Sequence, residues 1–319
     1  MGCSTRIIAI IGIALLALLL TGLVVGPLGS AILGVKAPSF ISVSSPHVIL
    51  PSEAIFHING FAITNTIIAS WLTIITLTVF FFCCTRKISI IPDRLQGFAE
   101  VAIETLLNFV TSVAGEQKAR TLFPIVATIF LYVMTNAYLG LLPIFGTIGF
   151  WEGEEYIFVP ILRGANTDVN VPLSIALVAF TCIEFWGIRS IGIFHYINGF
   201  FNFGQLRDGV VSLFKGKFGP ALSGILFGFI NIFVGLLEVL SHFIRIISFT
   251  FRLFGNMTAG EILLLVVTFL IPLIASIPFY GLELLVGFLQ SLIFAGLTLV
   301  FGVIAITPHS EEAHEEAHN

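Results

Sequence analysis

Long apolar segments, separated by shorter polar ones, dominate the chain. A helix rises about 1.5 Å per residue and the hydrocarbon core of a bilayer is about 30 Å thick, so about 20 helical residues cross it. The apolar segments of at least about this length are residues 7–26, 61–84, 122–142, 171–188, 221–271 and 281–306. Their apolar residues are continuous rather than alternating, which argues against a transmembrane β-barrel. The pattern predicts an all-α polytopic membrane protein with five or six transmembrane segments.

Composition supports the same class. Of the 319 residues, 57% are hydrophobic and 10% are charged, and the mean hydropathy is +1.07. A soluble globular protein carries about 25% charged residues, so composition excludes a soluble enzyme and a disordered chain. The net charge of −4 argues against a nucleic-acid partner, which requires a basic face. Membrane lipid is the expected surrounding.

Lys and Arg predict the orientation. If the N-terminus is cytoplasmic and each segment crosses once, ten of these residues lie inside and only Lys36 and Arg163 lie outside. Both termini are then cytoplasmic, provided that residues 1–26 are retained. This N-terminal segment is either an extra span or a signal-like segment, because Arg6 precedes an apolar run without a clean cleavage site.

The remaining segments divide the chain. Residues 27–60, with four prolines, are expected to form a mostly irregular outer segment, and residues 61–308 the membrane domain. Within that domain, residues 88–120 carry apolar positions at helical spacing with acids between them, which predicts an amphipathic helix along the membrane interface. Residues 309–319 form an acidic cytoplasmic tail.

No metal or cofactor is expected. The four cysteines show no spacing typical of a metal site or a disulfide framework. His314 and His318 are four residues apart, but glutamates surround them, so a solvated tail is preferred.

The segment 221–271 is too long for an ordinary span. As a continuous helix it would be about 75 Å long, more than twice the thickness of the bilayer core. It therefore either breaks, near Gly235, or crosses at a tilt steeper than the usual value of about 20°. The short connection at 272–280 makes it a long tilted antiparallel hairpin with 281–306.

Polar residues follow one face of this long segment. They recur at intervals of three or four residues, the helical period: Glu238, Ser241, Arg245, Ser248, Arg252 and Asn256. Glu261 points to the opposite face, and Glu283 and Gln290 share one face of the last segment. The direction of the hairpin places three of these residues on the cytoplasmic side of Arg252, namely Glu238, Ser241 and Ser248. The outer side receives Asn256, Glu261 and Glu283, with Gln290 deeper.

The charge of Arg252 favours a role in transport over a purely structural role for the polar residues of this segment. An ionised Arg at the bilayer centre costs about 2.5–3.5 kcal/mol on insertion scales, and packing alone does not require it. A guanidinium neither gives up nor accepts a proton at ordinary pH, so it blocks a continuous proton path. Polar groups on both sides predict two half-pathways separated by a cationic barrier. A moving proton carrier must then come from a partner.

Several motifs at this point resemble one family. Residues 248–261, SFTFRLFGNMTAGE, are similar to the signature of subunit a of bacterial rotary (F-type) ATP synthases, a Ser followed by R-L-F-G-N-M-x-A-G-E. The resemblance includes RGANTDVN at 163–170, GLLP at 140–143 and Gln290, and it covers roughly residues 50–308.

The resemblance implies a non-catalytic membrane component of the H⁺-transporting two-sector ATP synthase, in the cell inner (plasma) membrane and without a cofactor. It implies contact with the c-ring and with the peripheral stalk b subunits. Arg252 would be the essential arginine that faces a c-ring carboxylate. The outer half-channel would be lined by Asn256, Glu261, Glu283 and Gln290. The cytoplasmic half-channel would be lined by Glu238, Ser241 and Ser248.

Some positions depart from the family or stay open. The family often has Arg-Pro before the essential arginine, where this chain has Arg245 and Ile246, and some members have His at the position of Glu283. Glu184 fits either the border of the exit path or a side chain that reaches the interface, and His242 is expected to be packed or hydrogen-bonded. H⁺ and Na⁺ coupling both fit.

One alternative function competes. A stand-alone channel or secondary transporter could use Arg252 to bind an anionic substrate, and it would transport without any ring.

Overall fold

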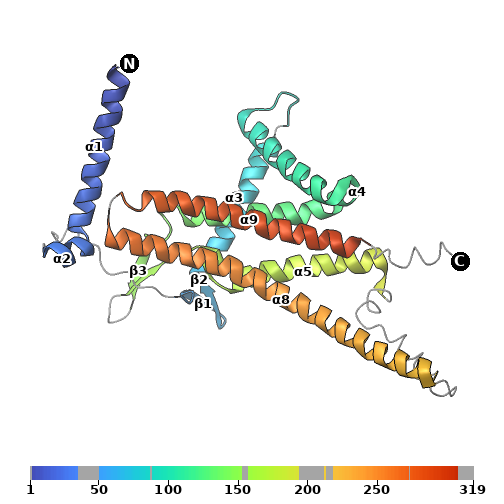
Figure 1. The fold of residues 1–319 in the computed structure, drawn as a ribbon. Helices are drawn as coiled ribbons and strands as arrows, with labels where there is room; N and C mark the ends of the chain where they lie inside the picture. The colour runs from blue at the N-terminus through green and yellow to red at the C-terminus, as the bar shows by residue number, and fades with distance from the viewer. Residues whose placement is uncertain are drawn as a thin grey trace. The chain divides into compact units, whose positions relative to one another are not determined.

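In the computed structural model, the described residues are 2–34, 50–86, 88–152, 157–193, 212, 218–272 and 274–307. Five helices in this part are long and apolar enough to cross a membrane (Figure 1). They are α3 (Asn65–Thr85), α4 (Arg94–Gly140), α5 (Asn170–Ile191), α8 (Phe218–Leu270) and α9 (Ile277–Ile306). This confirms the prediction of an all-α polytopic membrane protein.

The N-terminal part is less uniform than the sequence suggests. Residues 2–25 form helix α1 (Gly2–Val25), and the expected irregular segment contains helix α2 (Pro27–Leu33) and strand β1 (Ala54–Ile58). Residues 35–49, with Lys36, lie outside the described residues, as does the acidic tail at 309–319 with His314 and His318. The two alternatives for residues 1–26, an extra span and a signal-like segment, both stay predictions.

Two small antiparallel hairpins accompany the helices. Strand β1 pairs with β2 (Phe61–Thr64), and β3 (Gly149–Glu152) pairs with β4 (Ile157–Pro160). Asn59 and Gly60 join the first pair with φ angles of 50° and 83°, as a two-residue type I′ turn requires. Helix α3 therefore begins at Asn65, and the prediction that the apolar span starts at residue 61 is wrong for its first four residues. Apolarity alone does not separate a strand from a helix end.

The chain forms two compact units. The first contains Met1–Phe82, Leu131–Val169 and Leu253–Leu292, and the second contains Cys83–Phe130, Asn170–Arg252 and Ile293–Asn319. The chain passes between them within α3, α4, α8 and α9.

In the first unit, buried polar contacts join the elements. Ser70 of α3 and Tyr132 of α4 share a hydrogen bond of 2.6 Å between their hydroxyls. Thr66 Oγ1 of α3 donates to Asp168 Oδ2 over 2.9 Å, just after the short 3₁₀ helix η1 (Ala165–Thr167). Such contacts favour one arrangement, since a buried polar group without a partner is costly.

In the second unit, the core is apolar. Its most buried side chains come from α4, α8 and α9, and include Val110, Leu122, Phe249, Phe294 and Leu299. The rings of Phe249 and Phe294 lie 5.0 Å apart, so α8 and α9 pack directly against each other here. At the end of α9, Lys118 Nζ of α4 donates to Thr307 Oγ1 over 2.8 Å.

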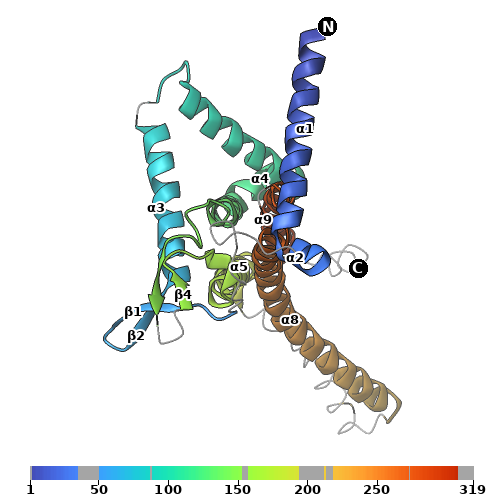
Figure 2. The ribbon, with the colours of Figure 1, turned by 90° about the vertical axis from the view of Figure 1, so that its left-hand side faces the viewer.

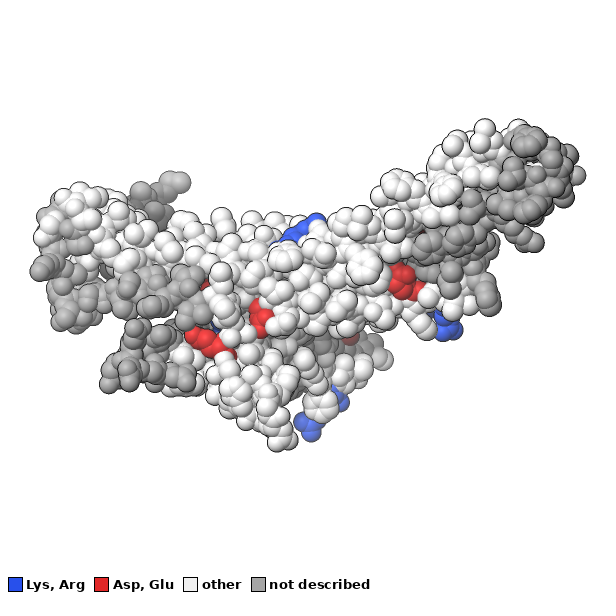
Figure 3. All heavy atoms as spheres, turned by 90° about the horizontal axis from the view of Figure 1, so that it is seen from below, with Lys and Arg blue, Asp and Glu red and all other residues white. Residues whose placement is uncertain are grey.

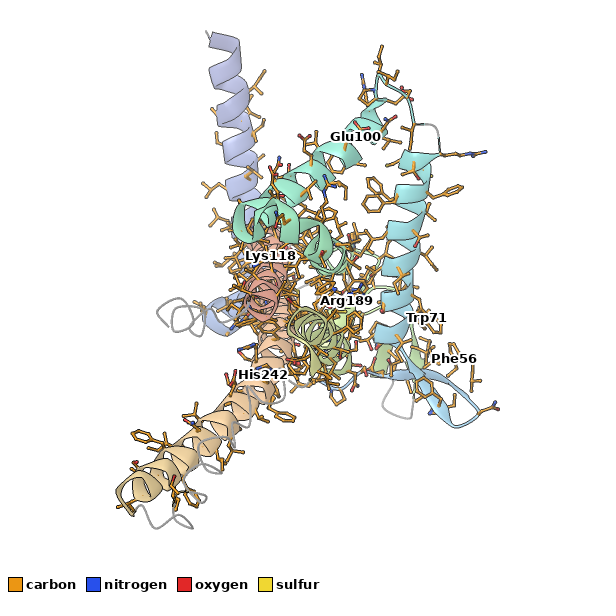
Figure 4. The ribbon with its side chains drawn as sticks, turned by 90° about the vertical axis from the view of Figure 1, so that its right-hand side faces the viewer. Phe56, Trp71, Glu100, Lys118, Arg189 and His242 are labelled. Carbon is orange, nitrogen blue, oxygen red and sulfur yellow. The ribbon has the colours of Figure 1, made fainter. Side chains whose placement is uncertain are left out.

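Helix α4 bends at Gly115, where φ is 74° and ψ is 159° (Figure 2). The predicted amphipathic segment is helical from Arg94 and forms the first arm of this element. Leu106 and Val110 of this arm are buried, whereas Leu95, Phe98 and Val101 are exposed. Figure 4 shows Glu100 and Lys118 on the two arms of the bend. The location of this first arm of α4 at the membrane interface stays a prediction.

Helix α8 runs without interruption for 53 residues. The alternative of a break near Gly235 is therefore wrong, and the continuous alternative holds. Only 11% of the most apolar window of α8 is buried, against 39% in α4 and in α9. The helix thus leaves most of its side chains available to lipid or to a partner.

Replacing Thr66 with Val should destabilise the protein. The change removes the donor to the buried Asp168 carboxylate, which should lower the free energy of unfolding by about 1–3 kcal/mol. Thermal unfolding of the purified protein in detergent measures this. Thr78→Val is the matched control, since exposed Thr78 on the same helix bonds only to the Ile74 carbonyl. Equal losses in the two variants would contradict the assignment.

Candidate functional site

A cavity in the first unit gathers the carboxylates that the sequence predicts on the outer side. Its volume is about 290 Å³, and it is lined by α4, α8, α9 and the segment around η1. Glu261 of α8 and Glu283 of α9 both line it, together with Arg163, Asn136 and Asn166. Glu261 and Glu283 therefore converge on one cavity, and their role in an outer half-channel stays a prediction.

Glu261 forms an ion pair with Arg163. Arg163 Nε donates to both Glu261 carboxylate oxygens, over 3.1 Å to Oε1 and 3.2 Å to Oε2, and Nη2 donates to Oε2 over 3.1 Å. Arg163 Nη1 also donates to the Pro51 carbonyl over 3.2 Å. The Arg163 side chain is 9% exposed and the Glu261 side chain is 30% exposed. This pair was not apparent from the residue pattern, because its members are 98 residues apart.

Glu283 is more enclosed than Glu261 and lies close to a glycine. It is 8% exposed, and no hydrogen bond or ion pair of its side chain occurs among the described residues. A Cβ atom at Gly260 of α8 would overlap the Glu283 carboxylate. The absence of a side chain at position 260 therefore makes room for this carboxyl group.

Asn256 and Gln290 also meet in the first unit. Asn256 Nδ2 donates to Gln290 Oε1 over 2.7 Å, which joins α8 and α9. Gln290 is 2% exposed, and its Nε2 has no hydrogen-bond partner among the described residues. The antiparallel pairing of 256 with 290 and of 260 with 283 confirms the predicted hairpin.

A polar network that the sequence did not reveal borders this cavity. Asn136 Nδ2 donates to Thr73 Oγ1 over 2.9 Å, and Asn136 Oδ1 accepts from the Asn166 backbone N–H over 3.2 Å. The Asn166 side chain is 1% exposed, yet both of its polar atoms lack a described partner. A polar, buried and unpartnered side chain at a cavity is a suitable site for ordered water.

In the second unit, the predicted essential arginine is exposed. Arg252 Nη2 donates to Ser248 Oγ over 3.4 Å, and within the described part of the chain no carboxylate forms an ion pair with it. Ser248, Ser241 and Glu238 on the same face of α8 are exposed as well. Arg245 is different, because its guanidinium lies 3.7 Å from the centroid of the Phe301 ring. Charged side chains are few and isolated on the face shown in Figure 3.

Glu184 of α5 and His242 of α8 meet in the same unit, and His242 is labelled in Figure 4. His242 Nδ1 and Glu184 Oε1 are 2.8 Å apart, and the Phe180 ring lies edge-on to the imidazole, with centroids 5.6 Å apart. The expectation of a packed His242 is confirmed. Glu184 is its partner, which the sequence did not indicate.

The comparison with known families settles what kind of chain this is. Residues 67–302 match the family model described as ATP synthase A chain. The chain belongs to the ATP synthase A chain family. It is a multi-pass component of the ATP synthase membrane sector in the role of subunit a, and it therefore has partners within that sector.

Bacterial relatives agree with this membership. The ATP synthase subunit a of Gloeobacter violaceus is 29% identical over 77% of this chain and 85% of its own length. ATP synthase subunit a 3 of Pelobacter propionicus is 31% identical over 77% of this chain and 87% of its own length. The ATP synthase subunit a of a Sulfurihydrogenibium species is 30% identical over 77% of this chain and 98% of its own length.

Substituting Gly260 with Ala should impair proton transport by the assembled ATP synthase. The new methyl group requires the Glu283 carboxyl group, the end of a flexible side chain, to move from its place in the cavity. ATP-driven acidification of inverted membrane vesicles should therefore fall several-fold, because a displaced proton-transfer group loses its geometry, while assembly of the complex should be unchanged. Gly281→Ala on α9 is the control, because nothing lies within 4 Å of a Cβ there. Equal pumping by both variants would show that position 260 does not place Glu283.

Proposed function

We propose that this chain is the stator subunit that carries protons to and from the rotating c-ring of the ATP synthase. Arg252 would face the c-ring carboxylate, and two half-channels would connect that point to the two sides of the membrane. The exposure of Arg252, whose guanidinium has only Ser248 as a described partner, is the observation that carries the proposal.

An exposed guanidinium on an apolar helix requires an external counter-charge. Its neighbours Phe251, Ile247 and Ile244 are also exposed, so this part of α8 is suited to hydrocarbon or to another protein. A charged side chain in hydrocarbon is costly unless it is paired or solvated. A carboxylate on a neighbouring helical subunit supplies the pair, which is what the c-ring offers in this family.

The outer half-channel is proposed to include the cavity of the first unit. Glu261 and Glu283 line this cavity, and its unpartnered amide groups provide sites for water. The Asn256–Gln290 hydrogen bond joins the same two helices at a deeper level of the hairpin. Titratable carboxyl groups linked by water are a usual proton path.

The cytoplasmic half-channel is proposed to follow α8 in the second unit. Glu238, Ser241 and Ser248 are exposed on the face that also bears Arg252. These residues precede Arg252 along α8, whereas Asn256 and Glu261 of the outer set follow it. This order along the helix supports two separate paths.

Arg252 separates the two paths by its charge. A protonated ring carboxyl is neutral and can turn through lipid at tolerable cost, whereas an ionised one cannot. Near Arg252, the guanidinium stabilises the ionised form and the proton leaves. Each proton that crosses a potential of 100 mV supplies about 2.3 kcal/mol, which the rotor transmits.

The setting is proposed from the same reasoning. The chain would lie in the inner (plasma) membrane of a bacterium, beside the b subunits of the peripheral stalk. Residues 61–308 would form the membrane domain and 309–319 a cytoplasmic tail, with the N-terminus also cytoplasmic if residues 1–26 are retained.

Replacing Arg252 with Ala should abolish coupled proton transport. Vesicles with the assembled complex should lose ATP-driven acidification by at least about a hundredfold, as expected for a group that acts on the charge being transferred. Arg189→Ala is the control, since Arg189 is an exposed arginine at the end of α5. Acidification by Arg252→Ala at the parent rate would refute the proposal.

A second measurement tests the partner. Single cysteines at exposed positions 248, 252 and 256 should cross-link to the c-ring subunit, whereas cysteine at buried Leu253 should not. Proton transport by the purified subunit alone in liposomes would instead favour a stand-alone channel.

A further inference from the structure

We propose that Arg163 is a positioning residue that holds Glu261 as a fixed counter-ion, and that Glu283 alone carries protons through the outer cavity. This inference rests on the proposed function. Glu261 and Glu283 line the same cavity but have different surroundings, and the inference assigns them different roles.

Glu261 is fully engaged by Arg163. Both of its oxygens accept from the guanidinium, in three hydrogen bonds of 3.1, 3.2 and 3.1 Å. A planar guanidinium matches an ionised carboxylate in this two-pronged geometry, and it keeps its own charge at all ordinary pH values. The two-pronged contact therefore holds the Glu261 carboxylate against Arg163 at the cavity wall.

Arg163 is itself fixed in place. Its remaining nitrogen, Nη1, donates to the Pro51 carbonyl over 3.2 Å, and the residue is 8% exposed. Arg163 is thus held by the chain that precedes β1 and does not depend on Glu261 alone for its position. The ion pair acts as a neutral, ordered part of the cavity wall.

Glu283 has the features of a carrier. No fixed positive charge pairs with it among the described residues, so it can bind and release a proton without breaking an ion pair. Gly260 leaves space at its carboxyl group, and the unpartnered Asn166 amide lines the same cavity as a site for water. The other titratable side chains that line this cavity are Glu261, Arg163 and Tyr280. Asp168, close to Arg163 in the chain, accepts from Thr66.

The inference predicts that the charges at 163 and 261 matter as a pair. Glu261→Gln leaves an uncompensated guanidinium, which repels protons at the cavity. Arg163→Gln leaves a carboxylate without its partner, which competes with Glu283 for the proton. Removal of both charges, in Arg163→Gln with Glu261→Gln, restores neutrality and leaves Glu283 untouched.

The experiment compares these variants in the complete ATP synthase in inverted vesicles. Each single variant should lower ATP-driven acidification by about tenfold, because one member of a partly buried ion pair is removed and the other charge is left without its partner. The double variant should recover to within about threefold of the parent, a coupling of the size that double-mutant cycles detect. Arg163→Lys, which keeps the charge but not the two-pronged geometry, should fall between Arg163→Gln and the parent. Glu283→Gln should lose about a hundredfold, as for a missing proton-transfer group.

The pH dependence of ATP-driven acidification distinguishes the proposed proton carrier, Glu283, from the proposed counter-ion, Glu261. Glu283→His exchanges a carboxyl for an imidazole, whose reference pKa is about two units higher, so the pH profile of acidification should move. The double variant should keep the parent profile, because its carrier is unchanged. A merely structural role for the pair would not restore activity in the double variant and would not conserve the profile.

The outcomes are decisive in each direction. A double variant no more active than Glu261→Gln would show that Glu261 is itself a carrier, and it would overturn the inference. A double variant that assembles less well than either single variant would overturn it too, since neutral pairs are expected to be tolerated. Normal acidification by both Arg252→Ala and Glu283→Gln would instead refute the proposed function.

Discussion

The cost of an ionised side chain in hydrocarbon governs this structure. With only 10% charged residues, the chain places few charges in its apolar helices, and each one needs a partner or water. Glu261 has Arg163, Glu184 has His242, and Arg245 lies over the Phe301 ring. Arg252 differs from these three, because a side-chain hydroxyl is its only described partner and its guanidinium is exposed, whereas Glu283 is enclosed without a described partner.

This contrast links folding to function. Charges that are satisfied inside the chain stabilise one arrangement of the helices, whereas Arg252 is satisfied only when a second protein brings a counter-charge. A partly buried ion pair such as Arg163–Glu261 is weak support for stability. Its presence in the cavity wall therefore favours a role in setting the electrostatic potential of the cavity. The chain therefore pairs most of its interior charges by itself, whereas the exposed Arg252 on α8 needs a counter-charge from another protein.

Much of the fold was readable in the sequence. The lengths of the apolar segments predicted five or six spans, of which the structure has five among the described residues, and the short connection at 272–280 predicted the antiparallel hairpin of α8 and α9. The pairs Arg163–Glu261 and Thr66–Asp168 were not readable, because their members lie 98 and 102 residues apart and no periodicity links such positions. The strand at Phe61–Thr64 was missed because apolar strands and helix ends have the same composition.

The contact between Gly260 and Glu283 has a consequence for sequence variation. A long acidic side chain at 283 requires the space that a missing side chain at 260 provides. Chains of this fold with a bulkier residue at 260 should carry a shorter or differently shaped group at 283. The two positions, on different helices, are thus expected to change together during evolution.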